Sequence, residues 1–146
     1  MNNYMELKVK ALSINESFVR TVVASFCLQL SPTIEELNDI KTAVSEAVTN
    51  SIVHAYPNKQ GDVLIKANIV NDNTFIVEVC DDGVGINDYE KAKEPFYTSK
   101  PDCERSGMGF AVMESFMDKV TLSSNNGKGL KVTMEKKIVR QDSGDK

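Results

Sequence analysis

The sequence predicts an α+β fold, a two-layer α/β sandwich with helices on one face of a mixed, mainly antiparallel sheet. Strand-like and helix-like periodicities both recur along the chain but do not alternate strictly, which disfavours a doubly wound parallel sheet. Two pairs of strand-like segments are each separated by a short turn-forming stretch, which is typical of antiparallel hairpins. The 146 residues, 41% of them hydrophobic, are enough for one compact core.

The first two elements are expected to be an edge strand and an amphipathic helix. Residues 5–11 alternate apolar and charged side chains, which is the period of a strand with one solvated face. Ser13 followed by Glu16 has the spacing of a capping box, which predicts a helix over about 14–29. The apolar stripe of this helix is expected to consist of residues at helical intervals, Ile14, Phe18, Val22 and Phe26.

The opposite side of this helix carries Arg20 among apolar residues, and is less polar than a solvated helix face should be. Its other members are Val23, Ala24 and Cys27. Two interpretations stay open. The face is covered by another part of the same domain, or it is a partner surface with Arg20 as its charged anchor.

A second helix is expected to run to about residue 55. It starts either at Ser31 before Pro32 or at Thr33 with Glu36, because both hydroxyls are good caps and proline is tolerated in the first turn. Helical spacing predicts a buried stripe formed by Leu37, Ile40, Val44, Ala47, Val48 and Ser51.

The second half of the chain is expected to contain two hairpins separated by a long loop and a short helix. These elements fall at residues 63–70 and 74–82, about 108–118, and 119–124 and 128–137. Periodicity disappears between them, and the segment of about 86–106 is too long for a plain connection, which predicts a lid. We expect a single domain over 1–139 and a flexible C-terminal tail over 140–146.

Composition argues against several classes of function. A net charge of -4 gives no basic face for a phosphate backbone, so direct nucleic-acid binding is disfavoured. The sequence shows no membrane-spanning run and no signal-peptide pattern at its start, so a cytoplasmic protein is expected. One histidine and the three cysteines, Cys27, Cys80 and Cys103, have no metal-clip spacing, which predicts reduced thiols and no zinc site.

Three short clusters together predict a nucleotide pocket. Glu46, Asn50 and His54 lie four residues apart on the second helix, residues 81–85 read Asp-Asp-Gly-Val-Gly at a strand end, and residues 106–109 read Ser-Gly-Met-Gly at a helix start. Each cluster alone matches by chance in many proteins. The three clusters occur in this order around a long lid. A nucleotide pocket between the second helix, the end of the hairpin and the lid would explain all of them.

The two glycine clusters suit the base and the phosphates of such a nucleotide. Asp81 ends an apolar strand, so its carboxylate would accept a hydrogen bond from the exocyclic amine of adenine, where guanine presents a carbonyl. Gly83 and Gly85 would let the backbone approach the base or sugar without a Cβ. Gly107 and Gly109 would free backbone N–H groups at a helix N-terminus, where phosphate oxygens are favoured.

The polar row on the second helix suits phosphoryl transfer. Asn50 offers a neutral oxygen to a magnesium ion, and Glu46, one turn earlier, can accept a proton from an attacking hydroxyl. Lys100 and Arg105 in the lid would neutralise the transferring phosphoryl group. His54 would either contact the phosphates or lid, or simply stabilise the last carbonyls of its helix.

Four stretches resemble the N box, first glycine box, lid motif and second glycine box of the Bergerat (GHKL) ATP-binding fold, which gyrase, histidine kinases and MutL share. They read EAVTNSIVHAY (46–56), DDGVGI (81–86), PFYTSKP (95–101) and ERSGMGF (104–110). Within that superfamily the chain most resembles the family of anti-sigma F factors of endospore-forming bacteria, which are serine protein kinases.

This resemblance implies a homodimer that binds an RNA polymerase sigma factor, sigma F, and uses ATP and Mg²⁺ to phosphorylate a serine of an anti-anti-sigma factor. It places Glu46 on the catalytic acid of the family, Asn50 on the magnesium ligand, Asp81 on the adenine-reading residue and Arg20 on a partner-contacting arginine. A related switch kinase for the general stress sigma factor, or for another regulator, is the alternative. An ATP-gated binding module would share the same pocket.

The resemblance also implies nucleotide contacts along both glycine boxes, at Gly83, Gly85, Ser106, Gly107, Met108 and Gly109. One departure concerns the last glycine motif, which in this fold is commonly Gly-Thr. Here Gly129 is followed by Leu130, so the hydroxyl that supports adenine through water in the family is missing at this position.

Overall fold

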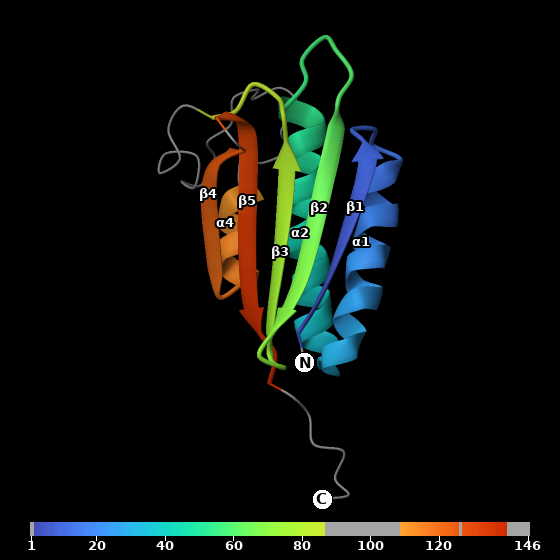
Figure 1. Ribbon diagram of the computed structural model, residues 1–146, viewed down its shortest axis with the longest axis vertical. Coiled ribbons are helices and arrows are strands. Elements are labelled where there is room, and N and C mark those ends of the chain that lie inside the picture. Colours follow the sequence, from blue (N-terminus) through green and yellow to red (C-terminus); the bar gives the residue numbers. More distant parts are fainter. Residues whose placement is uncertain (1, 87–108, 126, 140–146) are drawn as a thin grey trace, which may run out of the picture.

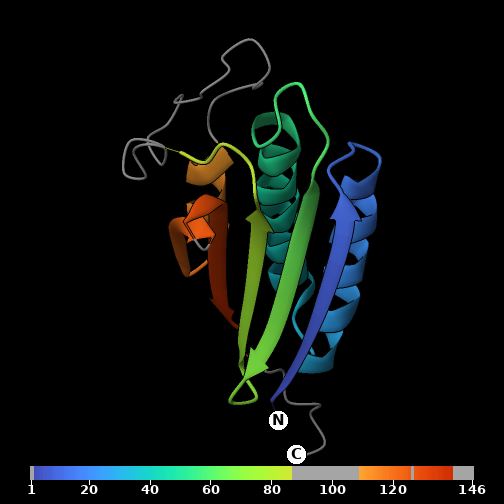
Figure 2. The ribbon, with the colours of Figure 1, turned by 45° about the horizontal axis from the view of Figure 1, so that its top comes forward.

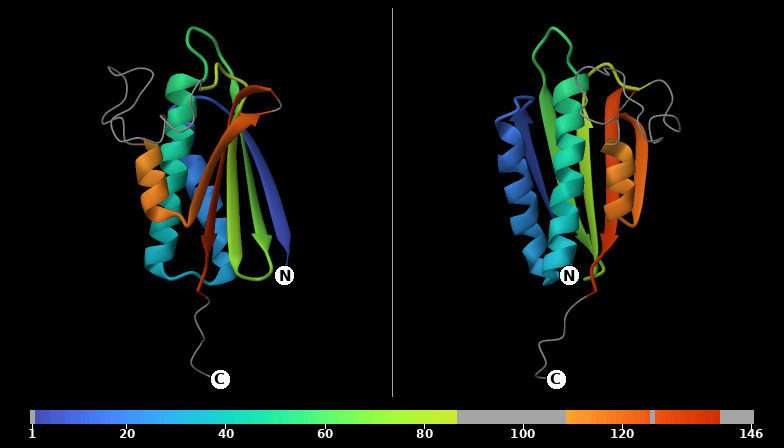
Figure 3. Two further views of the ribbon diagram at one scale, coloured as in Figure 1. Left: turned by 90° about the vertical axis from the view of Figure 1, so that its left-hand side faces the viewer. Right: turned by 180° about the vertical axis from the view of Figure 1, so that it is seen from behind.

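The computed structural model describes residues 2–86, 109–125 and 127–139, and it forms a five-stranded sheet with helices packed on one face (Figure 1). The strand order is β1-β2-β3-β5-β4, and all described strand pairs are antiparallel. Figure 3 shows α1, α2 and α4 together in one layer, and no helix of the described residues lies on the other face of the sheet. The expected two-layer α+β sandwich is therefore confirmed.

The described elements follow the expected order along the chain. They are β1 (Asn3–Lys10), α1 (Asn15–Cys27), the short 3-10 helix η1 (Leu28–Leu30), α2 (Ile34–His54), β2 (Asp62–Val70), β3 (Thr74–Asp81), α4 (Gly109–Phe116), β4 (Lys119–Asn125) and β5 (Lys128–Lys137). The expected edge strand is confirmed, because β1 pairs only with β2 within the sheet.

The start of α1 differs from the expected capping box. Ser13 does not cap the helix, because Ile14 holds the N-cap position in a helical conformation and provides no side-chain hydrogen bond there. The entry to the helix is fixed differently: the Asn15 side chain donates a hydrogen bond to the Lys10 carbonyl at 2.9 Å. The Ser-x-x-Glu spacing therefore predicted the region of the helix correctly, but the predicted N-cap interaction is wrong.

Of the two possible starts for α2, the second is right. The Thr33 hydroxyl accepts a hydrogen bond from the Glu36 N–H at 3.0 Å, and the Glu36 carboxylate accepts one from the Thr33 N–H at 2.9 Å. This capping box satisfies two backbone donors that a helix end leaves without an intrahelical partner. Ser31 instead lies in the left-handed region, at φ 52°, where the chain turns into α2.

The buried side of α1 is largely the face opposite the expected stripe, although Phe26 of that stripe packs against the core. Its buried residues are Val19, Val23, Ala24 and Cys27, whereas Ile14 is 79% exposed and Phe18 is 53% exposed. Since α1 packs against both α2 and the sheet, the smaller side chains on this face allow close approach, and helical spacing alone could not select between two apolar faces. The sequence left open whether the face of Val23, Ala24 and Cys27 is covered by the same domain or by a partner. The structure shows that the domain itself covers these three residues.

The core lies between the helix layer and the inner face of the sheet. The buried stripe of α2 runs as expected, except that Leu37 is only partly buried and Ala43 joins it. Each central strand alternates buried inner residues with partly exposed outer ones. Among the described residues, Ser51 and Asp81 are the buried polar ones, and both lie at the same end of the molecule.

Burial also decides the behaviour of the two described cysteines. Cys27 in the helix layer and Cys80 in β3 are both free and buried. Burial, with the nearby Glu36 carboxylate adding to it, raises the pKa of the Cys27 thiol to about 12. Burial likewise raises the pKa of Cys80 to about 11. Both thiols therefore stay protonated at neutral pH and have little nucleophilic character.

Several predicted features lie outside the described residues. These are the lid and the C-terminal tail, together with Lys100, Arg105, Ser106, Gly107 and Met108. Of the second glycine cluster the structure describes Gly109, which is the first residue of α4. No helix in the described part of the chain is both long enough and apolar enough to cross a membrane.

Candidate functional site

Asp81 is the best-defined polar group of the candidate site. It is the last residue of β3 and is 3% exposed. Its Oδ2 accepts a hydrogen bond from the Ser51 hydroxyl of α2 at 2.9 Å. Its Oδ1 accepts two from backbone N–H groups, of Gly83 at 3.0 Å and of Leu130 at 3.2 Å. These donors come from three segments and hold the carboxylate in one orientation (Figure 2 shows the ends of α2 and β3 side by side).

The position of Asp81 carries an electrostatic cost. Burial raises the pKa of its carboxyl above the usual value, and the hydrogen bonds from Gly83, Ser51 and Leu130 oppose this rise only in part. A buried charge is unfavourable unless donors compensate it. A ligand that donates one more hydrogen bond to this carboxylate would therefore recover part of the cost.

A hollow opens beside this carboxylate. It is lined by Asn50 and His54 from α2 and by Asp81, together with Ala55, Gly85, Ile86 and Leu130. The structure thus brings together four of the predicted site residues from two distant stretches of sequence. Glu46, one turn before Asn50 on α2, lines a different hollow, which it shares with Arg20 of α1.

Two glycines let the chain make this arrangement. A Cβ at Gly83 would collide with the Ala55 carbonyl at the end of α2, so only glycine allows the turn after β3 to pack there. Gly129 has φ +57°, and a Cβ there would collide with the Asp81 main chain. The close approach of Gly129 places the Leu130 N–H on the Asp81 carboxylate, so Leu130 takes part through its backbone.

Arg20 has a defined orientation on α1. Its Nε lies 3.6 Å from Glu16 Oε2, one turn earlier, and its Nη2 donates a hydrogen bond to Ser17 Oγ at 3.4 Å. The Arg20 side chain is 37% exposed, so it sits at the border between the helix layer and solvent. The Arg20 guanidinium can therefore be reached by a partner from solvent.

Three further residues, which the sequence analysis did not assign to the site, support it through hydrogen bonds. Ser51 donates to Asp81, and the sequence signal for this role was a hydroxyl within an otherwise apolar stripe of α2. The Tyr56 hydroxyl accepts a hydrogen bond from the Asp82 N–H at 2.8 Å. The Asn125 side chain donates to the Asp81 carbonyl and to the Asp82 carboxylate, both at 3.1 Å. Nothing local in the sequence signalled the Tyr56 and Asn125 contacts.

We expect Gly83→Ala to destabilise the fold by roughly 1–3 kcal/mol, because its methyl group would overlap the Ala55 carbonyl and force the turn away from α2. Urea unfolding followed by circular dichroism measures the change. Val84→Ala is the matched control, since Val84 is the next residue and is 66% exposed. A Gly83 variant as stable as the Val84 variant would contradict the tight packing of this turn.

Comparison with known proteins agrees with this geometry. The family model described as the histidine kinase-like ATPase domain matches residues 10–136. An anti-sigma F factor of Clostridium acetobutylicum is 58% identical over 138 residues, which cover 94% of this chain and 96% of that protein. One from Caldanaerobacter subterraneus is 58% identical over 139 residues and covers 95% and 96%. The chain therefore belongs to the histidine kinase-like ATPase family and, within it, to the anti-sigma F factors.

A solved structure shares the fold at much lower identity. The crystal structure of the RsbU and RsbW domains of a Mycobacterium tuberculosis protein matches with a TM-score of 0.67 and 17% sequence identity. The match covers 93% of this chain and 32% of that one. This likeness supports the fold, and the assignment to a family rests on the close relatives.

Proposed function

We propose that this protein is an anti-sigma factor that binds sigma F and uses Mg-ATP to phosphorylate a serine of the cognate anti-anti-sigma factor. The observation that carries the proposal is the buried Asp81 carboxylate, held by three protein donors at a hollow that it shares with Asn50 and Gly85. The names of the two relatives described above, both anti-sigma F factors, support the choice of partner.

Asp81 fits an adenine ring through the chemistry of its carboxylate. Its Oδ1 already accepts two backbone hydrogen bonds, whereas its Oδ2 accepts one, from Ser51, and so has room for a second donor. The exocyclic amine of adenine is such a donor, whereas the carbonyl of guanine would face the carboxylate with another acceptor. Asp81 therefore selects adenine, and the three protein donors keep it from turning away.

The residues of α2 fit the phosphate end of the same ligand. The Asn50 side chain lines the hollow one and a half turns before Ala55, and its amide oxygen suits a magnesium ion that also takes water and phosphate oxygens. Bound ATP supplies the phosphoryl group. Glu46, one turn further from Asp81, accepts the proton of the attacking serine hydroxyl. His54 lines the hollow and keeps both of its expected roles open.

The remaining nucleotide contacts are expected to come from the segment before α4. Gly109 begins this helix, whose first N–H groups favour phosphate oxygens. Lys100, Arg105, Ser106, Gly107 and Met108 complete the proposed set. Homodimer formation belongs to the same proposal and is measured by light scattering of the purified protein.

Incubation of the purified protein with the anti-anti-sigma factor of the same organism and Mg-ATP tests the kinase activity. We expect one phosphoserine per substrate molecule, located by mass spectrometry. Co-purification from native cells, with and without ATP, tests the choice of sigma factor. Recovery of the general stress sigma factor in place of sigma F would favour the related switch kinase.

For Arg20→Glu we expect at least about tenfold weaker partner binding, with the fold and ATP affinity retained, because the reversed charge repels an acidic partner site. The lost ion pair with Glu16 is partly exposed and contributes little to stability. Partner binding is measured by titration calorimetry. Lys119→Glu, on the exposed side of β4, is the control for a reversed charge elsewhere. Equal partner affinity of the two variants would show that Arg20 does not contact the partner.

A further inference from the structure

A second hollow lies between α1 and α2. It has a volume of about 240 Å³ and is lined by Arg20 from α1 and by Asn38, Lys41, Thr42, Ser45 and Glu46 from α2. We call this hollow the α1–α2 groove. All six lining residues are exposed or only partly buried, so the groove can be reached from solvent.

The groove and the hollow beside Asp81 are lined by residues one turn apart on α2. Glu46 lines the groove, and Asn50, one turn later, lines the hollow. A base that takes the proton of an attacking hydroxyl must lie within hydrogen-bond reach of that hydroxyl. A nucleotide bound in the hollow would approach Glu46 from the side of Asn50, so we expect the hydroxyl to reach Glu46 from the groove.

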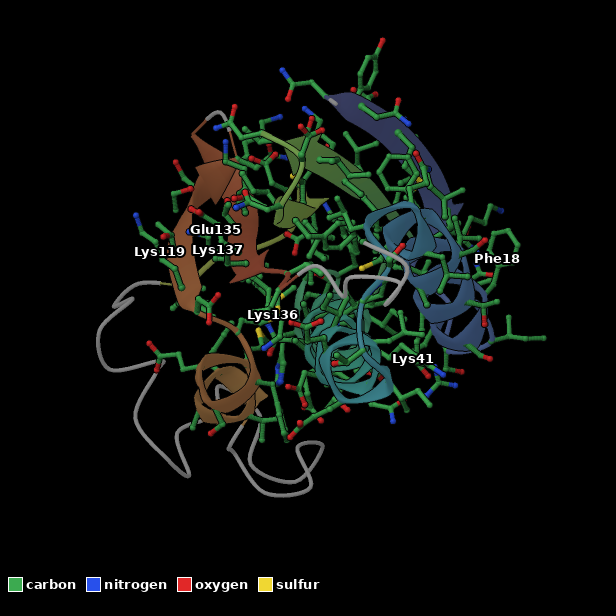
Figure 4. The ribbon with its side chains drawn as sticks, turned by 90° about the horizontal axis from the view of Figure 1, so that it is seen from below. Phe18, Lys41, Lys119, Glu135, Lys136 and Lys137 are labelled. Carbon is green, nitrogen blue, oxygen red and sulfur yellow. The ribbon has the colours of Figure 1, made fainter. Side chains whose placement is uncertain are left out.

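The charges of the groove indicate which segment it fits. Arg20 and Lys41 contribute two positive charges along it, and Glu46 contributes one negative charge at its end. The interaction with Glu16 holds the Arg20 guanidinium beside the groove. Figure 4 shows Lys41 on the side of α2 toward α1, across the molecule from Lys119. A segment with a carboxylate close to its hydroxyl residue complements this pattern.

The spacing along α2 sets the distance between the two groups. Lys41 precedes Glu46 by five residues, which places the two about 7.5 Å apart along the helix axis and about 140° apart around it. An extended segment advances about 3.3 Å per residue, so the axial distance alone spans two to three residues, and the rotation around the helix adds to it. The acidic residue that reaches Lys41 is thus expected about two to five positions from the residue whose hydroxyl reaches Glu46.

We propose, building on the kinase function above, that the α1–α2 groove binds the serine-bearing segment of the protein substrate in an extended form. Lys41 pairs with an acidic side chain about two to five residues from the serine and so determines which serine is phosphorylated. The serine Oγ forms the new bond to the γ-phosphorus, its proton passes to Glu46, and the bond from the γ-phosphorus to the bridging oxygen of ADP breaks.

Lys41→Glu and the milder Lys41→Gln test this role with the anti-anti-sigma factor as substrate. We expect kcat/KM for phosphotransfer to fall about tenfold for Lys41→Glu and less for Lys41→Gln. The affinity for ADP and the melting temperature should stay at the wild-type values, because Lys41 lies outside the nucleotide hollow. The matched control is Lys119→Glu, which should phosphorylate at the wild-type rate.

A charge swap makes the test specific. Each acidic residue about two to five positions from the phosphorylated serine is changed to lysine in turn, and one such substrate should be phosphorylated better by Lys41→Glu than by the wild type. Wild-type rates for Lys41→Glu, or no swap that restores activity, would overturn the proposal. So would a loss confined to sigma-factor binding. If the wild-type protein does not phosphorylate the substrate at all, the proposed kinase function itself is wrong.

Discussion

Glu46→Gln is expected to bind ATP normally and to lose serine phosphotransfer by about 100- to 10,000-fold. The glutamine has the same shape as the glutamate but cannot take the proton of the serine hydroxyl. Glu46 lines the α1–α2 groove one turn before Asn50, which lines the hollow beside Asp81, so we expect its carboxylate to be close to the place where both substrates would meet. Single-turnover phosphotransfer, measured with saturating Mg-ATP, separates this loss from any change in nucleotide binding.

Glu35→Gln is the matched control, because Glu35 is an exposed carboxylate in the first turn of the same helix. It should phosphorylate the anti-anti-sigma factor at the wild-type rate. A Glu46 variant that does the same would show that this carboxylate is not the base. A Glu46 variant that also fails to bind ATP would place the residue in nucleotide binding instead.

Asp81→Asn is expected to weaken ADP and ATP binding by about 10- to 100-fold, because a hydrogen bond to a charged acceptor is lost. The protein can accommodate the asparagine. Its oxygen can keep the two backbone donors, Gly83 and Leu130, while its amide group donates to the Ser51 hydroxyl. That same amide then faces the adenine amine, donor against donor, so the loss falls on the ligand and spares the fold.

The adjacent Asp82→Asn provides the comparison for titration calorimetry with ADP. Asp82 is exposed, and its side chain accepts a hydrogen bond from Asn125 away from the hollow. We expect its affinity for ADP to match that of the wild type. An Asp81 variant with the same affinity as the Asp82 variant would count against an adenine site at this carboxylate.

The elements that the sequence predicted well depend on local signals. The capping box of α2 requires only Thr33 and Glu36, three residues apart, and the hairpin of β2 and β3 follows from a short polar turn between two β-branched runs. Such features are decided by neighbours in sequence, so periodicity and turn chemistry are sufficient to find them.

The inward face of α1 could not be predicted in the same way. Both of its faces are apolar, and the choice depends on how closely α1 approaches α2 and the sheet. The larger residues, Ile14 and Phe18, gave the stronger periodic signal but remain exposed. Side-chain size therefore misled the assignment, because close packing between layers favoured the smaller residues.

The candidate site shows the same division between local and distant contacts. Spacing within α2 placed Asn50 and His54 on one side of the helix, and both line the hollow. The donors to Asp81 come instead from positions 30 and 49 residues away, at Ser51 and Leu130. Only the packing of α2 and β5 against the end of β3 brings them together. That Arg20 of α1 and Glu46 of α2 line the same groove likewise required the tertiary structure.

A crystal structure of the protein with bound ADP tests the central claim most directly. We predict that the exocyclic amine of adenine lies within hydrogen-bond distance of the Asp81 carboxylate, with the phosphates extending along α2 toward Asn50. An adenine ring bound anywhere else would contradict the assignment of this site, and with it the proposed route from the α1–α2 groove to Glu46.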